Sequence, residues 1–518
     1  MPENGGPPIG SLDALVRRAA AGGPDRPAIV HGGRRWTWGE VDAAVDRAAA
    51  GFSAHSLESG SRVAVLLPNG VDWVVGVVGA LRAGLVVVPV NTAYTDDELQ
   101  YVLDDSGASL LLTDAPRPAI TGVPVLTSLP DGEPSAQLPP RDPADLALLA
   151  YTSGTTGRPR GAMLTHGALL ANQQQCLAMS PPPVQSEDLV LVVLPLFHVY
   201  GFNGGLGLAM ATGACMYLLD GFDPVGSLQL MADEAITTVP GAPPMFQAWL
   251  AAADAAGSDV ALRRAFAAVR MVSSGAAPLP VDVWTAMKER AAVTVWEGYG
   301  LTEAAPVLAS TLATGRPKPA CIGGPPPGIE IRLRDAAGTD HGSRVREDVF
   351  GDPFPDEAPD QGGEICARGA NLFSGYWPDG ADGPDDDGWL ATGDIAYRDA
   401  DGDLHLVDRR GDLVLVSGFN VYPGEVERVL DSHPGVAESA VIGIPDARTG
   451  EAVQAVVVRV PGVEPVTEAE LLAHAALSLA RFKVPRSVFF VPSLPHSLTG
   501  KVSRARLREL GLSGVQGG

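Results

Sequence analysis

Cysteine, lysine and long apolar runs are scarce in this chain of 518 residues. The cysteines never stand in C-x-x-C spacing, which argues against a structural zinc site or a disulfide framework and predicts a reducing, cytoplasmic location. The first residues carry neither a basic nor an apolar segment, so no signal peptide is expected. The most apolar stretch, Val71 to Val90, contains Asp72 and Arg82. We expect a buried helix followed by a strand there, rather than a membrane span.

Positive charge is also in short supply. The chain has 37 lysines and arginines against 61 acidic residues, a formal net charge of −24. A nucleic-acid binder needs a basic face, so nucleic acid is not an expected partner. Only four of the basic residues are lysines, namely Lys288, Lys318, Lys483 and Lys501. A lysine inside a motif therefore stands out, and any phosphate-bearing ligand must be met by locally placed positive charge.

The length of the chain exceeds one compact core, so at least two domains are expected. Strand-like and helix-like segments alternate, as in Val63–Leu67, Val71–Arg82 and Leu85–Val90. This order is typical of largely parallel sheets covered by helices. We predict an α/β fold with a large N-terminal domain over residues 1–409, of mixed and parallel sheets layered with helices. A small C-terminal α+β domain is expected over residues 410–518.

Residues 151–166 read Tyr-Thr-Ser-Gly-Thr-Thr-Gly-Arg-Pro-Arg-Gly-Ala-Met-Leu-Thr-His. Glycine lets the backbone turn its N–H groups inward as a nest for an anion, and hydroxyls and arginines complete a cradle suited to phosphate. The run Ala144–Ala150 predicts a strand before this loop, and Leu164 begins a predicted helix after it, so we expect a strand-to-helix junction. The glycine spacing is not that of a Walker A loop. On its own, the pattern is equally compatible with a polar surface loop.

Seven further motifs follow in order along the chain. They are Leu194-Pro-Leu-Phe-His-Val-Tyr-Gly, Ser273-Ser-Gly-Ala-Ala-Pro-Leu, Gly298-Tyr-Gly-Leu-Thr-Glu, Thr392-Gly-Asp, Asp408-Arg-Arg-Gly-Asp-Leu-Val, Ser417-Gly-Phe-Asn-Val-Tyr-Pro and Leu498-Thr-Gly-Lys. Together with the loop they resemble the adenylate-forming superfamily of acyl-CoA synthetases, coumarate-CoA ligases, luciferases and adenylation domains. The resemblance implies that ATP and Mg²⁺ activate a carboxylic acid as an acyl-adenylate, and that coenzyme A then accepts the acyl group.

The resemblance and the side-chain chemistry together suggest the nucleotide site. Tyr299 offers adenine a stacking face, and Glu303 can ligate Mg²⁺, a hard ion that prefers oxygen, with Thr156 as a second metal ligand. Thr302 is expected to donate to the α-phosphate, although a lone Thr-Glu pair more often caps a helix. The expected ATP-binding residues are Thr152, Ser153, Gly154, Thr155, Thr156, Gly157, Arg160, Gly275, Ala276, Ala277, Gly298, Tyr299, Gly300, Asp394 and Arg409.

Lys501 is expected to be catalytic, bridging the substrate carboxylate and the α-phosphate. The resemblance implies that the small domain is mobile and rotates after this step, so that Gly418 and Phe419 line the tunnel for coenzyme A. A plain hairpin turn is the alternative for residues 417–420. Two positions depart from the family pattern: Arg160 stands where lysine is usual, and Gly411 where aspartate or lysine is usual. Arg160 keeps the positive charge of lysine, and Gly411 leaves the backbone free to rotate.

The acid is expected to be an apolar monocarboxylate. No lysine or arginine occurs between Arg160 and Arg263, so a second carboxylate would be buried unpaired there. We favour a medium- or long-chain fatty acid, with an aryl or cinnamate-type acid as the alternative. His198 is expected at the pocket mouth, in a catalytic or only a structural role. Candidate lining residues are Phe197, Phe202, Met210, Pro244, Met245 and Phe246, with Gly204, Gly205, Gly207, Ala209 and Ala211 leaving room for a chain or serving helix packing.

Three other functions stay open from the sequence. They are a luciferase-like oxygenase, a fatty acyl-AMP ligase feeding a carrier protein, and a nucleotide-binding relative without activity. No feature of the sequence demands oxygen chemistry, and no obvious insertion would block domain rotation. Intact Glu303, Asp394 and Lys501 argue against the inactive relative. Peripheral membrane contact is left open, as is the choice between monomer and homodimer.

Overall fold

The protein is described by a computed structural model. The described residues are 10–55, 57–134, 141–152, 159–335, 340–341, 362–409, 414–416, 419–421, 423–446, 449–479, 481–496, 502–504 and 506–508. Contacts within the chain divide it into two compact units. Unit 1 comprises Met1–Gly154, Arg158–Glu330 and Ala367–Leu390, and unit 2 comprises Thr155–Gly157, Ile331–Cys366 and Ala391–Gly518. A functional division at residues 409/410 stays a prediction.

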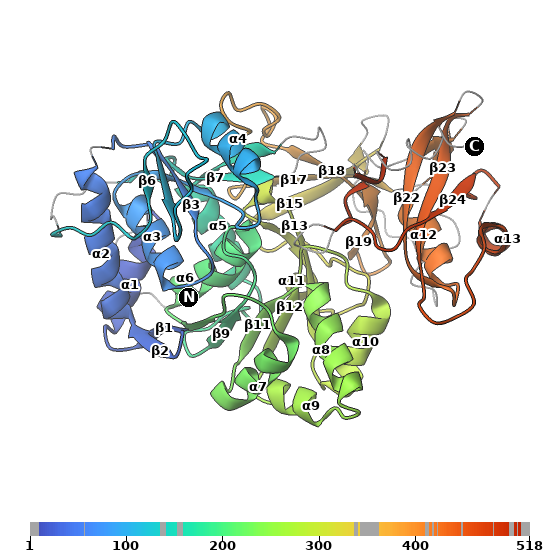
Figure 1. Ribbon diagram of the computed structural model, residues 1–518, viewed down its shortest axis with the longest axis horizontal. Helices are drawn as coiled ribbons and strands as arrows, with labels where there is room; N and C mark the ends of the chain where they lie inside the picture. Colours follow the sequence, from blue (N-terminus) through green and yellow to red (C-terminus); the bar gives the residue numbers. More distant parts are fainter. Residues whose placement is uncertain are drawn as a thin grey trace. The chain divides into compact units, whose positions relative to one another are not determined.

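Unit 1 is built on two sheets in which most strand pairs are parallel (Figure 1). The eight-stranded sheet has the order β14-β13-β12-β11-β9-β10-β1-β2, with antiparallel pairs at its two edges. Its strands are β1 (Pro27–His31), β2 (Arg34–Thr37), β9 (Leu189–Val192), β10 (Cys215–Leu218), β11 (Thr238–Gly241), β12 (Met271–Ser274), β13 (Val295–Gly300) and β14 (Val307–Ser310). The six-stranded sheet has the order β6-β5-β3-β4-β7-β8 and ends in the antiparallel pair β7–β8. Its strands are β3 (Arg62–Leu66), β4 (Val86–Pro89), β5 (Leu110–Thr113), β6 (Val125–Leu126), β7 (Leu146–Thr152) and β8 (Arg160–Thr165).

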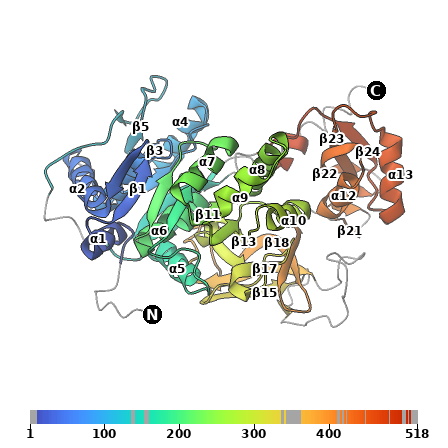
Figure 2. The ribbon, with the colours of Figure 1, turned by 90° about the horizontal axis from the view of Figure 1, so that it is seen from below.

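Helices fill the space between the two sheets and cover their outer faces (Figures 1 and 2). One buried cluster joins the inner faces of both sheets to α1 (Asp13–Gly22), α2 (Trp38–Ala54), α3 (Val71–Arg82), α5 (His166–Leu177) and α6 (Leu208–Thr212). A second cluster lies between the eight-stranded sheet and α7 (Pro224–Glu234), α8 (Pro243–Ala255), α9 (Val260–Phe266) and α10 (Val281–Arg290). A third cluster packs α4 (Asp96–Ser106) on the outer face of the six-stranded sheet. Strand side chains alternate between faces, so Val190 and Val192 join the inner cluster while Leu191 and Val193 join the second.

Local sequence signals place several of these elements as expected. The apolar stretch Val71–Val90 forms α3 and then β4, both buried, as predicted. Helix α2 begins with a capping box, in which the Thr37 side chain accepts the Glu40 N–H and the Glu40 carboxylate accepts the Thr37 N–H. The same reciprocal pairing starts α4, and such boxes satisfy N–H groups that the first helical turn leaves unpaired.

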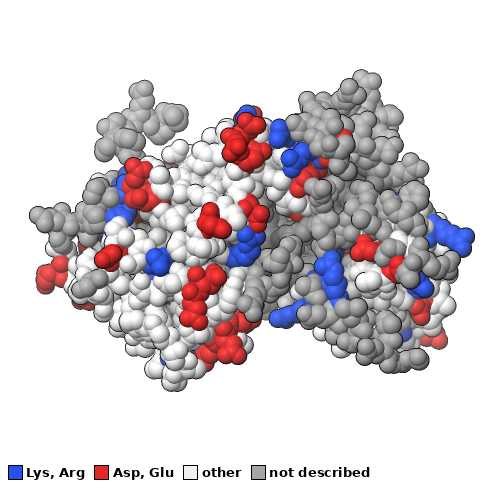
Figure 3. Space-filling model, turned by 90° about the horizontal axis from the view of Figure 1, so that it is seen from above, with Lys and Arg blue, Asp and Glu red and all other residues white. Residues whose placement is uncertain are grey.

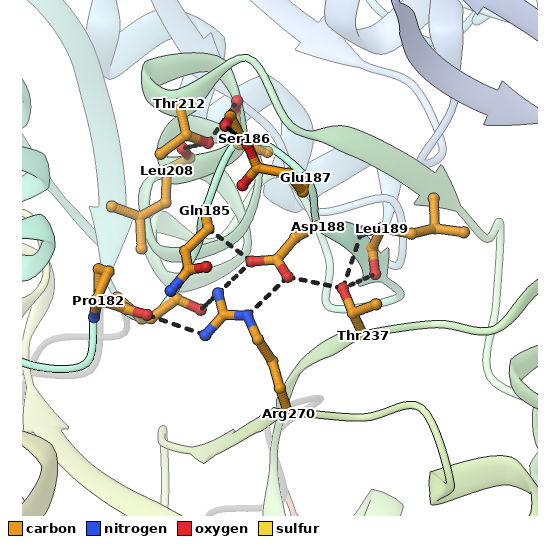
Figure 4. Close-up of polar contacts among 12 residues, drawn as sticks. Pro182, Gln185, Ser186, Glu187, Asp188, Leu189, Leu208, Thr212, Thr237 and Arg270 are labelled. Atoms are coloured by element: carbon orange, nitrogen blue, oxygen red, sulfur yellow. Dashed lines mark hydrogen bonds and ion pairs between the residues drawn. The ribbon is translucent and has the colours of Figure 1, made fainter.

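A buried ion pair ties together the amino ends of three parallel strands (Figure 4). Arg270, just before β12, donates from Nε to Oδ1 of Asp188 at 2.8 Å, and Thr237, just before β11, donates to the same oxygen at 2.8 Å. Burial acts to raise the pKa of Asp188, but hydrogen bonds from Arg270, the Gln185 N–H and Thr237 outweigh it and hold the pKa below its ordinary value. Ligands of parallel sheets bind at the carboxyl ends of strands, so this cluster stabilises the opposite edge.

Unit 2 holds most of a five-stranded sheet of order β16-β15-β17-β18-β19, and all of another in which β21-β20-β23-β22 is joined by β24 beside β23. The first consists of β15 (Ile329–Arg334), β16 (Asp340–His341), β17 (Gly363–Gly369), β18 (Leu390–Arg398) and β19 (Leu404–Arg409). The second consists of β20 (Val414–Val416), β21 (Phe419–Val421), β22 (Val436–Asp446), β23 (Gly450–Arg459) and β24 (Ser487–Phe490). Helices α12 (Pro423–Asp431) and α13 (Glu468–Ser478) pack on the second sheet through a shared buried cluster (Figure 2). The predicted mixed α/β fold with a smaller C-terminal α+β part is confirmed.

The surface carries its charges in local groups. On the face drawn in Figure 3, described acidic side chains gather in several clusters and described basic side chains lie between them. Among the described residues, none of the helices has both the length and the apolar character that crossing a bilayer requires.

Candidate active site

The stem of the phosphate loop is a β-hairpin. Thr152 ends β7 and Arg160 begins β8, and the two residues are cross-strand partners in an antiparallel ladder. The expected strand-to-helix junction is therefore wrong, because residues 160–165 form a second strand before α5 begins at His166. The apolar centre of this strand is buried against β7, and Thr165 only then caps the helix. Pairing with β7 and burial beside it thus decide that Leu164 and Thr165 extend a strand, although their sequence also suits a helix.

Part of the expected site lies outside the described residues. This applies to Ser153, Gly154, Thr155, Thr156, Gly157, Gly411, Gly418 and Lys501. Arg409 and Phe419 are described as backbone in β19 and β21, but their side chains are not described. The roles of all these residues stay predictions.

Tyr376 links the loop stem to the expected metal ligand. Its phenolic hydroxyl donates a hydrogen bond to Oε1 of Glu303, and the Thr152 side chain hydrogen-bonds with the same phenol. Burial, the charge of Glu303 and the hydrogen bond to it raise the pKa of Tyr376 far above its ordinary value. The phenol therefore stays protonated at neutral pH and remains a donor to the carboxylate.

Arg160, at the other side of the stem, contacts the same tyrosine. Its guanidinium carbon lies 3.9 Å from the centroid of the Tyr376 ring, and its Nη1 donates to Oδ2 of Asp382 at 2.7 Å. The side chain is 34% exposed, so solvent and a ligand can still reach it. A planar guanidinium can stack on a ring and pair with a carboxylate at the same time, which an ammonium group cannot do in the same way.

Backbone hydrogen bonds fix the segment that carries Tyr376. The Trp377 N–H donates to the carbonyl of Gly161 in β8 at 2.8 Å, and the Phe373 N–H donates to the carbonyl of Glu303 at 2.9 Å. Residues 373–377 therefore run between the loop stem and the Thr302-Glu303 turn, and they bring two distant motifs of the sequence together.

Buried amides hold the turn that carries Thr302 and Glu303. The carbonyl of Ala305 accepts from Nδ2 of Asn203 at 2.6 Å, and the carbonyl of Ala304 accepts from Nδ2 of Asn371 at 2.8 Å. Both asparagines are at most 1% exposed, and glutamines of α5, Gln173 and Gln175, orient their side chains. The turn is the short 3-10 helix η2 (Thr302–Ala304), which has no side-chain cap. The helix-capping alternative for the Thr-Glu pair is thus not realised.

The segments expected around adenine follow two neighbouring strands. β12 and β13 are adjacent and parallel, so Gly275–Ala277 after β12 and Gly298–Gly300 at the end of β13 share the carboxyl edge of the sheet. Ala276 has a φ of 72°, and a Cβ built on Gly300 would lie 2.1 Å from the carbonyl oxygen of Pro306. Tyr299 is 8% exposed. The backbone is thus closely packed at Gly300, and the stacking role of Tyr299 stays a prediction.

A buried carboxyl precedes this edge. Glu297 is 6% exposed, and its Oε1 has no hydrogen-bond partner among the described residues. Burial raises the pKa of Glu297 to about 8, although backbone N–H groups of Leu279 and Ala320 act to lower it. The side chain is therefore largely protonated at neutral pH.

The residues expected to line an acyl pocket are mainly core residues. Phe202 and Met210 belong to the cluster between the sheets, and Met245 and Phe246 belong to the cluster under α7 to α10. The exposed position among the six is Pro244, and Phe197 is only partly buried beside the His198 ring, 5.2 Å away between centroids. Four of the six candidates thus pack in the core of the fold.

Two of the small residues serve side-chain packing in the π-helix η1 (Tyr200–Gly207). A Cβ on Gly204 would lie 2.7 Å from Cδ2 of Tyr200, and one on Gly207 would lie 2.6 Å from Oδ1 of Asn203. Tyr200 approaches Ser273 at 3.3 Å between hydroxyls, and burial raises its pKa to about 12. The packing alternative therefore holds at these two glycines.

The expected ribose residues lie opposite each other in unit 2. Asp394 of β18 pairs in register with Arg409 of β19. The Asp394 N–H donates to Oγ1 of Thr392 at 3.2 Å, and the N–H of Gly393 donates to Oε1 of Glu364 at 3.2 Å. Both contacts help to fix the β18 backbone around Asp394.

The segment around Lys501 is anchored on both sides. His496 and Val502 form an antiparallel bridge, and the Ser503 N–H donates to the carbonyl of Pro495 at 2.7 Å. Arg504 follows and binds both carboxylate oxygens of Glu427 in α12, at 2.8 and 3.0 Å. A bidentate pair of this kind fixes orientation as well as position.

The Glu303 carboxylate is of the kind that a hard divalent cation prefers as a ligand. One carboxylate oxygen accepts from Tyr376, and no described residue hydrogen-bonds the other oxygen. Another group of carboxylates lies in the β18–β19 turn, at Asp399, Asp401 and Asp403. There Asp399 accepts the N–H groups of Asp401 and Asp403 at 3.0 and 2.9 Å, so this group forms the turn itself.

Sequence reasoning missed Tyr376, Asn203 and Asn371. Tyr376 lies in Phe-Ser-Gly-Tyr-Trp, a run in which its chemistry is not apparent, and the asparagines look like ordinary polar residues. Their contacts with the Thr302–Ala305 turn join residues 67, 73 and 102 positions apart, and such pairings leave no local signal in a single sequence.

Comparison with known proteins agrees with the family resemblance that the sequence motifs indicate. The model of the AMP-binding enzyme family matches residues 16–377, and that of the AMP-binding enzyme C-terminal domain matches residues 425–501. A feruloyl-CoA synthase of Amycolatopsis is 37% identical over 95% of this chain and 97% of that protein. A long-chain-fatty-acid–CoA ligase of Bacillus subtilis is 33% identical over 97% of this chain and 95% of that protein. Among solved structures, ATP-bound MatB from Rhodopseudomonas palustris has a TM-score of 0.85 and 32% identity, covering 96% of this chain and 99% of that one.

Proposed function

The chain belongs to the family of AMP-binding enzymes within the adenylate-forming superfamily and is an AMP-forming acyl-CoA ligase, and we propose that its acid is an apolar monocarboxylate, with a medium- or long-chain fatty acid favoured. The enzyme uses ATP and coenzyme A, with Mg²⁺ as the usual ion of this family. The observation that carries the choice of acid is the absence of lysine and arginine from residues 161–262.

In the first step the substrate carboxylate attacks the α-phosphorus of ATP. An acyl–phosphate bond forms, the bond to the β-phosphate bridge breaks, and pyrophosphate leaves. Two anions must meet, so catalysis rests on positioning and on neutralising charge. Thr152 and Arg160 at the loop stem are proposed to contact the phosphates, and Thr302 to donate to the α-phosphate. Lys501 is proposed to hold the two reacting anions together.

Glu303 is proposed to hold Mg²⁺ with Thr156, and the ion when bound neutralises the phosphate charge. The turn at residues 302–304 is held by Asn203 and Asn371, so the Glu303 backbone is already ordered before ATP binds. Tyr299 is proposed to stack on adenine and Asp394 with Arg409 to bind the ribose. His198 is proposed to lie at the acid pocket, with Phe197 beside its ring.

In the second step the thiol of coenzyme A loses its proton and attacks the acyl carbon. A thioester forms and AMP leaves. Gly418 and Phe419 are proposed to contact the pantetheine chain after a rotation of the C-terminal part, with Gly411 as the pivot. We also propose a cytoplasmic location, because the four cysteines do not stand in C-x-x-C spacing and such a pattern suits a reducing compartment.

An aryl acid of the cinnamate type is the second candidate. It is favoured by the 37% identity to the feruloyl-CoA synthase, above the 33% identity to the long-chain-fatty-acid–CoA ligase. Both acids are monocarboxylates with an apolar body, so the missing basic residues suit either. A succinate-like acid would leave a charge unpaired at a large cost.

The test is pyrophosphate release from the purified full chain with decanoate, hexadecanoate, ferulate and succinate, each with and without coenzyme A. We expect turnover and an acyl-CoA product with the fatty acids, and little turnover with succinate. Preference for ferulate would replace the first candidate by the second. Acyl-AMP without any acyl-CoA would indicate a ligase that feeds a carrier protein, and preference for succinate would overturn the argument from charge.

A further inference from the structure

Tyr376 makes three contacts that belong together. Its hydroxyl donates to Glu303 Oε1 and is hydrogen-bonded by Thr152, and its ring carries the Arg160 guanidinium at 3.9 Å. Thr152 and Arg160 are cross-strand partners at the two ends of the phosphate loop. One side chain therefore contacts both ends of the loop and the carboxylate expected to ligate the metal.

Ring packing and a backbone bridge hold the Tyr376 side chain in place. The ring packs edge-on against Phe373, with centroids 5.1 Å apart. The backbone of Ala162 in β8 forms a bridge with that of Tyr376 itself. A hydroxyl held in this way restricts the rotamers of Glu303, whose carboxylate would otherwise sample many orientations in water. Holding a ligand in one orientation is how outer contacts strengthen a metal site.

We propose that Tyr376 is a positioning residue, which orients the Glu303 carboxylate toward the magnesium ion of bound ATP and couples that orientation to the stem of the phosphate loop. The inference rests on the proposed role of Glu303. It deepens that role by assigning the residue through which the loop and the metal ligand act as one unit. Arg160 belongs to this unit because its guanidinium lies on the Tyr376 ring. Its carboxylate partner here is Asp382, and a bound phosphate would be a stronger partner.

The test uses Tyr376→Phe, which removes the hydroxyl and keeps the ring for Arg160 and Phe373. Binding of a non-hydrolysable ATP analogue to the full chain is measured by calorimetry, once with Mg²⁺ and once with EDTA. We expect the factor by which Mg²⁺ strengthens binding to fall about tenfold, while binding in EDTA changes less than about twofold. A thermal melt of each variant checks that it is folded.

Tyr151→Phe is the matched control. The Tyr151 hydroxyl also donates to a carboxylate, Oδ2 of Asp105 at 2.6 Å, and that carboxylate is not an expected metal ligand. This variant should keep the wild-type effect of Mg²⁺. Glu303→Gln should lose that effect, and the double variant Glu303→Gln/Tyr376→Phe should show no further loss, because the hydroxyl then has no carboxylate to orient.

Each outcome decides the inference. If Tyr376→Phe keeps the full effect of Mg²⁺ while Glu303→Gln loses it, the positioning role is wrong and the metal assignment stands. If Glu303→Gln keeps the effect, the metal assignment itself fails. An equal loss of affinity with Mg²⁺ and with EDTA would make Tyr376 a phosphate or structural residue, which also overturns the proposal.

Discussion

The two regions that carry the expected chemistry are stabilised in different ways. Glu303 and Arg160 in unit 1 are held by buried amides, a tyrosine and strand backbone, with the asparagines at most 1% exposed. In unit 2, the described residues that flank Lys501 are held by the His496–Val502 bridge, the Ser503–Pro495 hydrogen bond and the Arg504–Glu427 pair, whose side chains are 21% and 17% exposed. Fully buried amides thus take part in holding the first region, and partly exposed ion pairs take part in holding the second.

This difference fits a division of roles. Buried, fully hydrogen-bonded groups cost much to move, so we expect the turn that carries Glu303 to be ordered before a nucleotide binds. Partly exposed ion pairs contribute little stability and are easily exchanged for water. We therefore expect the contacts that flank Lys501 to exchange more readily, as the proposed rotation of the C-terminal part requires.

The largest expected effect is that of Lys501→Arg on the first step. Arginine keeps the charge, but its broad guanidinium cannot occupy the place of a compact ammonium between two anions. We expect adenylation, measured as pyrophosphate release, to fall about 100-fold. Transfer from a supplied acyl-adenylate to coenzyme A should stay within about threefold of wild type. Equal loss of both steps would remove the distinction between the two regions.

The next effect concerns the buried amides. Asn203→Ala leaves the carbonyls of Leu169 and Ala305 without their donors, at 3.0 and 2.6 Å in the wild type. We expect the free energy of unfolding to fall by about 2–4 kcal/mol, measured by urea denaturation. Gln229→Ala removes an exposed hydrogen bond from the side-chain amide to Asp233, and it should lower the free energy of unfolding by less than about 0.5 kcal/mol. Similar losses in the two variants would show that the core amides are not special.

How much of this site the sequence predicts depends on the range of each contact. Tyr299, Glu303 and Asp394 stand in short motifs, and the structure brings the first two to one region of unit 1 and sets Asp394 opposite Arg409 in unit 2. The strand β8 could not be predicted, because Leu164 and the residues after it suit a helix and only pairing with β7 decides the conformation of residues 160–165. Tyr376 could not be found either, since its role arises from contacts with Thr152, Arg160 and Glu303 far away in the chain.

A pH-dependent prediction follows from Glu297. The pKa of Glu297 is about 8 in the folded state, which is above its value in the unfolded chain. Between these two pKa values the folded state binds more protons, so the free energy of unfolding falls as pH rises. Glu297→Gln removes the titration and keeps the shape. We expect the variant to gain stability over wild type from about pH 5 to pH 8, by at most about 1.4 kcal/mol per pH unit.

Urea denaturation at several pH values measures this gain. Glu289→Gln, at an exposed position, should show a difference that does not grow with pH. A constant difference for Glu297→Gln as well would mean that the buried carboxyl is ionised throughout.

The smallest expected effect is that of Arg160→Lys. The charge is retained, but the stacking contact with Tyr376 is lost, and a partly exposed contact of this kind contributes about 0.5–1 kcal/mol. We expect adenylation to slow by about two- to fivefold. A loss as large as that of Lys501→Arg would show that the loop needs the shape of arginine as well as its charge.

The most direct test of the division of roles is the binding of Mg²⁺ and ATP to Lys501→Ala, measured by calorimetry beside Glu303→Gln. If unit 1 is a preformed site for nucleotide and metal, Lys501→Ala binds within about threefold of the wild-type Kd although it does not form the adenylate, and Glu303→Gln binds about tenfold more weakly. Weakening of at least tenfold in Lys501→Ala, with Glu303→Gln unchanged, would contradict the account.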